Sequence, residues 1–556
     1  MPIDQNPNLN PKPNPGRRLI DGRSLRRDEA RAARACADGL WVRETLADAL
    51  RRAAQQTPER VLLVDGERRI TARTLHDEAG RLAQALLARA PAGSVVSFML
   101  PNWHEAATIY LAATLAGMAV NPILPSLRER ETQFILEDVG SRFIFIPATF
   151  RKFDYAAMLG TVVGRMTTPP HVVVLRGDAG AHLAHDALLR ETPAPQPLPA
   201  IEADAVRMVM YTSGTTGRPK GVLHTHNTLH ALLRQLGEHW LIAPGDTFLV
   251  PSPISHIGGS IYAFESPLLL GTTAVVMDQW NPDEAVKLMD AEGITHMAGA
   301  TPFLEALLAA AERAGTRLPS LKVFICGGAS VPPQLIRRAQ RYFERAIVTR
   351  VYGSTEVPVT TVGATAPGDA AHGANTDGKP GFADVRLVKA DGSVVDPASG
   401  DDGEIRARGP QMLAGYLRDE DDVPAFDADG YFRTGDLARW VDGHYLVVSG
   451  RAKDIIIRNG ENIAPKEIED LLLGHPQIAE IAIVGIPDAR TGERAVAVIV
   501  AKPGTQPDVA GLAEFLSGTG IAKYKFPEQV ALWDALPKND AGKVLKHRIR
   551  ATLIGK

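Results

Sequence analysis

The stretch Tyr211-Thr-Ser-Gly-Thr-Thr-Gly-Arg-Pro-Lys-Gly221 directly follows the apolar run Met208-Val-Met-Tyr211. Its glycines permit backbone turns that other residues resist, and they let the chain approach a ligand closely. The serine and threonine hydroxyls add hydrogen-bond donors, and Lys220 adds a positive charge. Such a loop is suited to binding a polyphosphate. It lacks the Walker A spacing, which disfavours an ordinary P-loop kinase or GTPase.

Short apolar runs alternate with helical stretches on both sides of this loop. Val95–Leu100, His104–Ala116 and Ala119–Ile123 read as strand, helix and strand, which predicts a parallel sheet with helices on its faces. From about residue 378 to residue 448 the sequence pattern changes. Asp-Gly pairs separate short strands there, which favours a β-rich subdomain. From Asp454 onward the pattern indicates a small α+β unit.

The overall composition excludes several classes of partner. The 556 residues carry a formal net charge of -3, which leaves no electrostatic footprint for nucleic acid or an anionic membrane. The two cysteines form neither a disulfide framework nor a metal-ligand spacing. We find no secretory signal and no stretch apolar enough to be transmembrane. We therefore expect a cytoplasmic protein of more than one domain, and a homodimer is left open.

Four further motifs follow the polyphosphate loop in order. They are Val351-Tyr-Gly-Ser-Thr-Glu-Val357, Tyr431-Phe-Arg-Thr-Gly-Asp-Leu437, Gly450-Arg-Ala-Lys-Asp454 with Ile457-Arg-Asn-Gly-Glu-Asn-Ile463, and Leu536-Pro-Lys-Asn-Asp-Ala-Gly-Lys-Val544. From about residue 40 to the end, the chain resembles the adenylate-forming superfamily of acyl-CoA synthetases, peptide-synthetase adenylation domains and luciferases. Residues 254–270 look most like medium-chain or cyclohexanecarboxylate-type acyl-CoA ligases.

The resemblance implies a nucleotide site for ATP and Mg²⁺. Asp436 accepts hydrogen bonds from the ribose hydroxyls, Arg451 lies on the ribose side, and Glu356 holds the Mg²⁺ that bridges the phosphates. Thr355 contacts a phosphate. The remaining residues that it assigns to the nucleotide are Thr212, Ser213, Gly214, Thr215, Thr216, Gly217 and Lys220 in the loop, Gly328, Ala329 and Ser330 beside adenine, and Tyr352 and Gly353.

The resemblance also implies catalytic and coenzyme A residues. The Lys543 ammonium bridges the attacking carboxylate and the α-phosphate, and its loss should cost roughly 10²–10³-fold in adenylation. His256 separates the acid site from the magnesium site. Gly460, Glu461 and Asn462 line the pantetheine tunnel of coenzyme A.

Residues 1–20 read as a flexible tail, because Pro and Asn repeat there with little to bury. The fold that the resemblance implies for the rest is an α/β chain of two domains. A large N-terminal adenylation domain, residues 21–452, holds two α/β subdomains and the β-rich subdomain. A hinge at Lys453 joins it to a small mobile α+β C-terminal domain, residues 454–556. After the acyl-AMP forms, rotation of the small domain should remove Lys543 and present residues 457–463 to the site.

Some residues depart from the family pattern or bear on the substrate. Arg350 replaces a residue that often contacts adenine, so such a contact is in doubt. No Asp lies between Pro251 and Ile261 to grip an α-amine, which disfavours an amino-acid substrate, although Glu265 lies just beyond. Small or apolar segments should line the acyl pocket and suit a short to medium aliphatic or alicyclic acid. They are 261–264, 300–302, 326–329 and 351–357.

The expected function is therefore an ATP-dependent ligase that forms an acyl-CoA through an acyl-AMP, with release of AMP and pyrophosphate. Three alternatives remain. The enzyme could load the acyl group onto the phosphopantetheine of a carrier protein, or it could be a luciferase-like oxygenase that uses the same adenylate. The third is a nucleotide-binding scaffold without catalysis, against which Lys220, Glu356, Asp436, Arg451 and Lys543 argue together.

Overall fold

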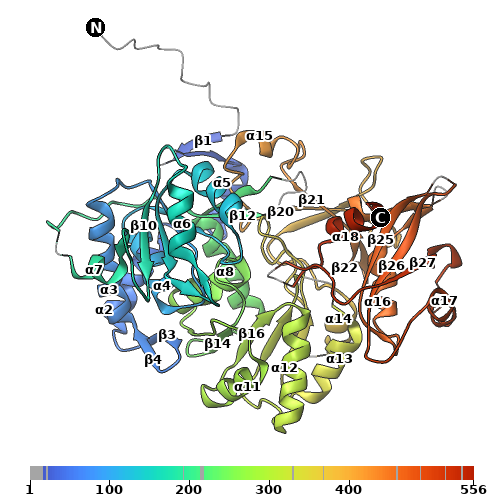
Figure 1. Cartoon of the computed structure of the whole chain (residues 1–556). Helices are drawn as coiled ribbons and strands as arrows, with labels where there is room; N and C mark the ends of the chain where they lie inside the picture. Colours follow the sequence, from blue (N-terminus) through green and yellow to red (C-terminus); the bar gives the residue numbers. More distant parts are fainter. Residues whose placement is uncertain are drawn as a thin grey trace.

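The computed structural model describes most of the chain (Figure 1). The described residues are 17–20, 23–191, 193–212, 218–328, 331–366, 368–458, 461–488, 490–519, 521–539 and 542–555. Among these residues, none of the helices combines the length and the apolar character needed to span a bilayer.

The first sheet has seven strands in the order β11-β10-β7-β5-β6-β12-β13. Its strands are β5 (Val95–Phe98), β6 (Ala119–Pro122), β7 (Ser141–Pro147), β10 (His171–Leu175), β11 (Leu183–Ala184), β12 (Val206–Thr212) and β13 (Lys220–Thr225). All neighbours pair in parallel except β13, which returns antiparallel along β12. The central strands are buried on both faces, as continuous apolar runs in parallel sheets require.

The second sheet also has seven strands, in the order β18-β17-β16-β14-β15-β3-β4. They are β3 (Val61–Asp65), β4 (Arg68–Thr71), β14 (Thr247–Val250), β15 (Thr273–Val276), β16 (His296–Gly299), β17 (Val323–Cys326) and β18 (Ile347–Arg350). The β3-β4 hairpin thus belongs to a sheet whose other strands come after the whole of the first sheet. Strand β3 pairs in parallel with β15, residue Ala274 opposite Leu63.

Helices cover both sheets. Those of the first part are α2 (Leu46–Gln56), α3 (Ala72–Leu87), α4 (His104–Leu115), α5 (Glu129–Val139), α6 (Tyr155–Val163), α7 (His185–Arg190) and α8 (His226–His239). Those around the second sheet are α9 (Ile257–Ser260), α10 (Ser266–Leu269), α11 (Pro282–Ala291), α12 (Thr301–Ala314), α13 (Pro333–Tyr342) and α14 (Ala370–Asn375). Helix α4 is apolar on nearly every face and is accordingly buried.

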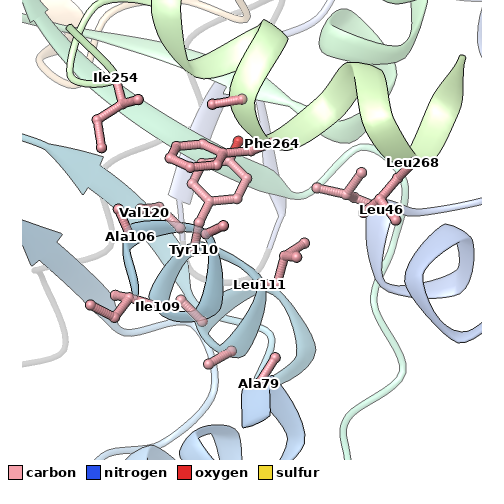
Figure 2. Packing of buried hydrophobic residues seen from close by; sticks show 14 of the residues in the cluster. Leu46, Ala79, Ala106, Ile109, Tyr110, Leu111, Val120, Ile254, Phe264 and Leu268 are labelled. Atoms are coloured by element: carbon pink, nitrogen blue, oxygen red, sulfur yellow. The ribbon is translucent and has the colours of Figure 1, made fainter. Parts of the chain in front are cut away.

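One hydrophobic core joins the two sheets. Phe264 lies in a π-helical turn, Ile261–Glu265, between α9 and α10, and its ring stacks on Tyr110 of α4 with the centroids 4.7 Å apart. Figure 2 shows these two rings against each other, with Val120 of the first sheet and Ile254 nearby. The two α/β subdomains thus share this central core, while each also has a hydrophobic cluster on its outer side.

The region of Asp-Gly pairs is β-rich, as predicted, and forms a four-stranded antiparallel sheet. Its strands are β19 (Asp384–Val388), β20 (Gly403–Arg408), β21 (Phe432–Val441) and β22 (Tyr445–Arg451), and the short helix α15 (Asp419–Asp422) lies between β20 and β21 in sequence. Its core includes Leu387, Ile405 and Leu446.

The C-terminal elements form a separate α+β unit, drawn in orange and red in Figure 1. Its sheet contains β23 (Ile456–Arg458), β24 (Glu461–Ile463), β25 (Ile478–Asp488), β26 (Gly492–Ala501) and β27 (Gln529–Leu532), with helices α16 (Pro465–Leu472), α17 (Val509–Ser517) and α18 (Lys546–Ile554). Helix α16 contacts β22 of the large domain. The fold class is thus confirmed as a large α/β N-terminal domain with a small α+β C-terminal domain.

The start of the described chain differs from the predicted tail of residues 1–20. Strand β1 (Arg17–Ile20) pairs antiparallel with β2 (Arg23–Arg26), so the last four residues of the predicted tail form a strand. Residues 1–16 lie outside the described part. The backbone N–H of Arg26 donates to the carbonyl of Ala414, and the Arg26 guanidinium lies 3.9 Å from the centre of the Phe426 ring, which ties β2 to the large domain. Helix α1 (Glu29–Ala37) follows.

Candidate active site

The two ends of the polyphosphate loop lie on neighbouring strands. Thr212 ends β12, Lys220 begins β13, and these residues are directly paired across the antiparallel ladder. The Lys220 ammonium lies 3.3 Å from Oδ1 of Asp421 and 5.1 Å from the centre of the Tyr416 ring. The predicted loop residues Ser213, Gly214, Thr215, Thr216 and Gly217 lie outside the described part of the chain.

Glu356 stands beside these loop ends. The Tyr416 hydroxyl donates a 2.9 Å hydrogen bond to its Oε1, and the Thr212 hydroxyl lies 3.5 Å from the same oxygen. The backbone N–H of Leu413 donates to the Glu356 carbonyl, which fixes the local chain. A carboxylate at the edge of a phosphate loop is the ligand type that Mg²⁺ prefers. Glu356 therefore fits the predicted metal role, which stays a prediction.

His224 of β13 supports the same segment from the strand beneath it. Its Nε2 donates a 2.7 Å hydrogen bond to the carbonyl of Thr355, and its Nδ1 lies 3.2 Å from the Thr228 hydroxyl. Burial lowers the pKa of His224 to about 4, so the ring is neutral at pH 7 and one nitrogen can accept. The strand that carries Lys220 and the loop that carries Glu356 are thus joined by one buried imidazole.

Three predicted nucleotide residues meet on the β-rich subdomain. Asp436 of β21 and Arg451 of β22 are paired in register, and Arg451 Nε lies 3.1 Å from Asp436 Oδ1. The Tyr352 hydroxyl donates a 2.6 Å hydrogen bond to the other oxygen, Oδ2. Burial and the Asp436 charge raise the pKa of Tyr352 well above its ordinary value, so this hydroxyl remains a donor. Their assignment to the ribose stays a prediction.

The loop that carries Lys543 lies over this group. Gly542 has a φ of +78°, and a side-chain carbon added to it would lie 3.5 Å from Cγ of Pro302 in the large domain. The Lys543 backbone N–H donates to Asn539 Oδ1 at 2.8 Å. Lys543 is exposed to solvent, yet partial desolvation beside the large domain lowers its pKa to about 8. Arg451 adds to this effect, and Asp436 opposes it.

His256 lies close to the charged ammonium of Lys543. It is the N-cap of α9, where its Nδ1 accepts from the backbone N–H of Gly258 at 3.4 Å. Desolvation by the surrounding chain lowers its pKa and the nearby Lys543 ammonium contributes, although the residue stays exposed to solvent. The structure thus brings Lys543, His256, Asp436 and Arg451 into one electrostatic neighbourhood, although they come from distant parts of the sequence. The roles of Lys543 and His256 in the chemistry stay predictions.

The remaining predicted residues are placed as follows. Lys453 lies in a single 3-10 turn, Ala452–Asp454, between β22 and β23, where burial and Arg451 lower its pKa. Glu461 and Asn462 belong to β24, which pairs with β23 in the small domain. Gly328 follows β17, and Gly353 follows β18. Ala329, Ser330 and Gly460 lie outside the described residues, so nothing further bears on their roles.

Arg350 does not face a nucleotide base. Its side chain is 2% exposed, and its Nη2 pairs with Oδ1 of Asp377 at 2.5 Å. Burial alone would raise the pKa of Asp377, but Arg350 and the backbone N–H of Val448 hold it below its usual value. The pair therefore ties β18 to β22, which explains why a charged residue is tolerated there.

Glu265 is likewise engaged inside the protein. Its Oε1 accepts a 2.6 Å hydrogen bond from the Tyr110 hydroxyl, and its Oε2 lies 2.8 Å from Nη2 of Arg207. Both members of the ion pair are almost fully buried, at 1% and 2% exposure. Burial raises the pKa of Glu265, and Arg207 opposes that effect. Glu265 is thus already paired and is not aimed at a substrate amine.

The predicted acyl segments differ in exposure. The side chains of residues 261–264 are buried in the shared core, where Tyr262 stacks on Phe248 with centroids 5.1 Å apart. Residues 300–302, 327–328 and 351–353 retain partly exposed atoms beside the site. Cys326 is fully buried beneath them.

Away from this site, three residues of types that can bind a metal ion line a cavity of about 640 Å³. Asp65, His104 and Glu105 offer ligand atoms within 4.8 Å of one another. Nη2 of Arg176 already lies 3.0 Å from Asp65 Oδ2 and 2.7 Å from Glu105 Oε2. Arg68 Nη1 lies 3.2 Å from Nε2 of His104, so Nδ1 carries the proton and donates toward Asp65. Arg176 already pairs with both carboxylates, and the protonated Nδ1 of His104 cannot coordinate a metal. The cluster therefore does not fit a metal ion.

Sequence comparison places the chain among known enzymes. The family described as AMP-binding enzyme matches residues 50–417, and the AMP-binding enzyme C-terminal domain matches residues 467–543. The medium-chain fatty-acid–CoA ligase of Escherichia coli K12 is 32% identical over 536 residues, covering 95% of this chain and 94% of that protein. A Streptomyces protein named salicylyl-CoA synthase and salicylate adenylyltransferase is 31% identical, covering 93% and 95%.

Structural comparison agrees. The crystal structure of ATP-bound MatB from Rhodopseudomonas palustris superposes with a TM-score of 0.80 at 26% identity, covering 91% of this chain and 98% of that one. The chain therefore belongs to the AMP-binding enzymes, the adenylate-forming family of acyl-CoA and aryl-CoA ligases that act through an acyl-AMP.

Proposed function

We propose that this protein is an ATP-dependent ligase that converts a short to medium aliphatic or alicyclic carboxylic acid to its acyl-CoA. The acid's carboxylate attacks the α-phosphate of ATP, so that pyrophosphate leaves and an acyl-AMP remains. The thiol of coenzyme A then attacks the acyl carbon, and AMP leaves. The single observation that carries the proposal is the approach of Lys543, from the small domain, to Asp436, Arg451 and His256 of the large domain.

The proposed roles follow from this arrangement. The ammonium of Lys543 stabilises the negative charge that builds as the carboxylate approaches the α-phosphate, which is where preorganised charge contributes most. Asp436, held between Arg451 and Tyr352, orients the ribose. Glu356 would hold Mg²⁺, which neutralises phosphate charge when bound. His256 lies between the acid and this carboxylate.

The second half-reaction requires a different arrangement of the two domains. We propose that Lys453, in the short turn between β22 and β23, is the hinge. Rotation about it withdraws Lys543 and brings Gly460, Glu461 and Asn462 to the site, where they line the pantetheine path. Two cations of the small domain are already paired: Arg458 lies 2.6 Å from Glu528, and Lys525 lies 2.6 Å from Glu467.

The acid class is proposed from the chemistry around the site and from one relative. Apart from Thr301, the partly exposed residues at 300–302 and 327–328 are small or apolar, and Glu265 is unavailable as a counter-ion for an amine. The relative named as a medium-chain fatty-acid–CoA ligase supports an aliphatic acid. The relative named for salicylate makes aromatic acids the necessary comparison.

The test measures pyrophosphate, AMP and acyl products by mass, with ATP, Mg²⁺ and a panel of aliphatic, alicyclic and aromatic acids, with and without coenzyme A. We expect acyl-CoA only when coenzyme A is present, and chiefly from one cluster of aliphatic or alicyclic acids. Activity confined to benzoate-type acids would contradict the acid class. Accumulated acyl-AMP that ignores coenzyme A would favour loading of a carrier protein, to be tested with carrier phosphopantetheine.

Lys543→Ala separates the two half-reactions. Adenylation should fall by roughly 10²–10³-fold, because the charge at the α-phosphate is lost. Conversion of supplied acyl-AMP to thioester should continue, because Lys543 has then left the site. Equal loss of both half-reactions would give Lys543 a different role. Lys538→Ala is the matched control, since this lysine lies in the same segment and pairs with Glu480 at 2.6 Å.

A further inference from the structure

An acidic segment lies against the cationic end of the phosphate loop. The four residues of α15, Asp419–Asp422, are all acidic. Asp421 binds the Arg218 guanidinium with both oxygens, Oδ2 to Nη1 and Oδ1 to Nη2, each at 3.1 Å. Its Oδ1 also lies 3.3 Å from the ammonium of Lys220. One carboxylate thus engages both cations that follow the loop.

Glu420 completes the charge balance. Its Oε1 lies 2.8 Å from Nη2 of Arg218, so two carboxylates face two cations. The two contacts differ in exposure, because Asp421 is 7% exposed whereas the Glu420 side chain is 68% exposed. The next residue, Asp422, faces a different group, because its Oδ1 accepts a hydrogen bond from the backbone N–H of Tyr416. The contact of Asp421 is therefore the shielded one and the stronger of the two.

The arrangement resembles the one that a polyphosphate would make. A bidentate guanidinium and an adjacent ammonium are the donors that proteins use for phosphate oxygens. Here those donors are turned toward a carboxylate of the same chain. Lys220 is also held over the Tyr416 ring, whose hydroxyl binds Glu356, so the anion site and the proposed metal ligand share one support.

We propose that Asp421 is an internal counter-anion of the phosphate loop, which occupies Arg218 and Lys220 until the polyphosphate of ATP displaces it. The inference rests on the proposed function, because it takes polyphosphate to be the ligand of the loop. Its consequence is a lowered affinity for every ligand that carries a pyrophosphate unit. AMP, which lacks the β- and γ-phosphates, does not compete with Asp421 and is unaffected.

If Asp421 had an orienting role instead, its neutralisation would change the affinity for ATP and pyrophosphate in the opposite direction. If Asp421 instead held Arg218 and Lys220 in the orientation that binds phosphate, its neutralisation would weaken ATP and pyrophosphate. If it is displaced, its neutralisation removes the competition for these charged donors, which is worth about tenfold in binding. The direction of the change in affinity therefore decides between displacement and orientation, and AMP separates both from general damage to the site.

The experiment is calorimetric titration of the full-length protein with ATP, pyrophosphate or AMP in the absence of acid substrate. For Asp421→Asn we expect Kd values for ATP and pyrophosphate about tenfold lower, with that for AMP within twofold of wild type. Glu420→Gln should give a smaller change of the same sign. Glu344→Gln, a surface charge change far from the loop in sequence, should leave all three unchanged. In an Arg218→Gln background the effect of Asp421→Asn should shrink, because Asp421 then has one cation fewer to release.

Two outcomes overturn the inference. They are a weaker or unchanged affinity for ATP and pyrophosphate in Asp421→Asn, and an equal change for AMP. If Asp421→Asn unfolds at a lower temperature than wild type, the sign of the change in Glu420→Gln decides, since that exposed side chain supports no core. A wild-type protein that binds neither ATP nor pyrophosphate would refute the proposed function itself, which keeps the two failures distinct.

Discussion

Raising the pH from 7 to 9 should remove the charge of Lys543 in the free enzyme and with it most of the adenylation activity. The pKa of Lys543 is lowered to about 8, chiefly by desolvation beside the large domain and then by Arg451. A group with this pKa is roughly 91% charged at pH 7 and roughly 9% charged at pH 9, so kcat/KM should fall about tenfold, and about tenfold per unit beyond. A lysine with its ordinary pKa near 10.4 would lose only a few per cent of its charge over the same range.

The assay is pyrophosphate release without coenzyme A, at ATP concentrations well below KM, from pH 6.5 to 10. Under these conditions kcat/KM reports the ionisation of the free enzyme. The half-reaction from supplied acyl-AMP and coenzyme A is the internal control. It should rise with pH as the thiol ionises near pH 8.5, and it should lack the alkaline fall.

Lys543→Arg tests whether the alkaline fall belongs to this side chain. A guanidinium stays charged throughout the range, so the fall should disappear from the profile whatever rate the variant retains at pH 7. The reasoning would be refuted by a fall centred above pH 10. It would equally be refuted by a fall that persists in Lys543→Arg, or by the same fall in the thioester half-reaction.

Three other perturbations have defined outcomes. Lys453→Pro should spare one half-reaction and not the other, because it stiffens the proposed hinge; equal loss of both would exclude the hinge. Glu265→Gln should lower the free energy of unfolding in urea by about 3–5 kcal/mol, because it leaves Arg207 buried and unpaired. The half-exposed control Glu238→Gln should cost under about 1 kcal/mol, and equal costs would count against the buried pair. The pKa of His224 is about 4 in the folded protein against an ordinary 6.5, so its contribution to stability is full above pH 6.5 and is lost toward pH 4, up to about 3 kcal/mol. Urea unfolding of His224→Gln should therefore depend less steeply on pH than that of wild type, and parallel profiles would disprove this.

The sequence was a good guide where a residue acts within a motif. The motifs that contain Tyr352, Asp436 and Arg451 lie about 100 residues apart at most, and these three side chains do contact one another. The switch from apolar runs to Asp-Gly pairs also predicted the β-rich subdomain, because turn chemistry is local. Turns are set by residues that are close in the sequence, and the three predicted nucleotide residues belong to motifs that are expected to bind one ligand.

Hydrogen-bond and ion-pair partners that only the tertiary fold brings together could not be predicted from the sequence. Tyr416 and His224 hold the Glu356 segment, yet neither lies in a recognisable motif or a periodic pattern. Their identity depends on a hydrogen bond to a residue more than 50 positions away, which no local propensity encodes. Arg350 illustrates the same limit: the sequence shows that a charge is present, and only the fold shows that Asp377 neutralises it.

The β3-β4 hairpin has a consequence for the way in which the chain is made. Residues 61–71 leave the ribosome before their parallel neighbour β15 (Thr273–Val276), which follows roughly 200 residues later. At synthesis rates of about 5–20 residues per second, the free edge of β3 waits on the order of 10–40 seconds. An unpaired apolar strand edge is a template for wrong pairing. The interleaved sheets therefore leave one edge of β3 without its native partner until β15 has been made.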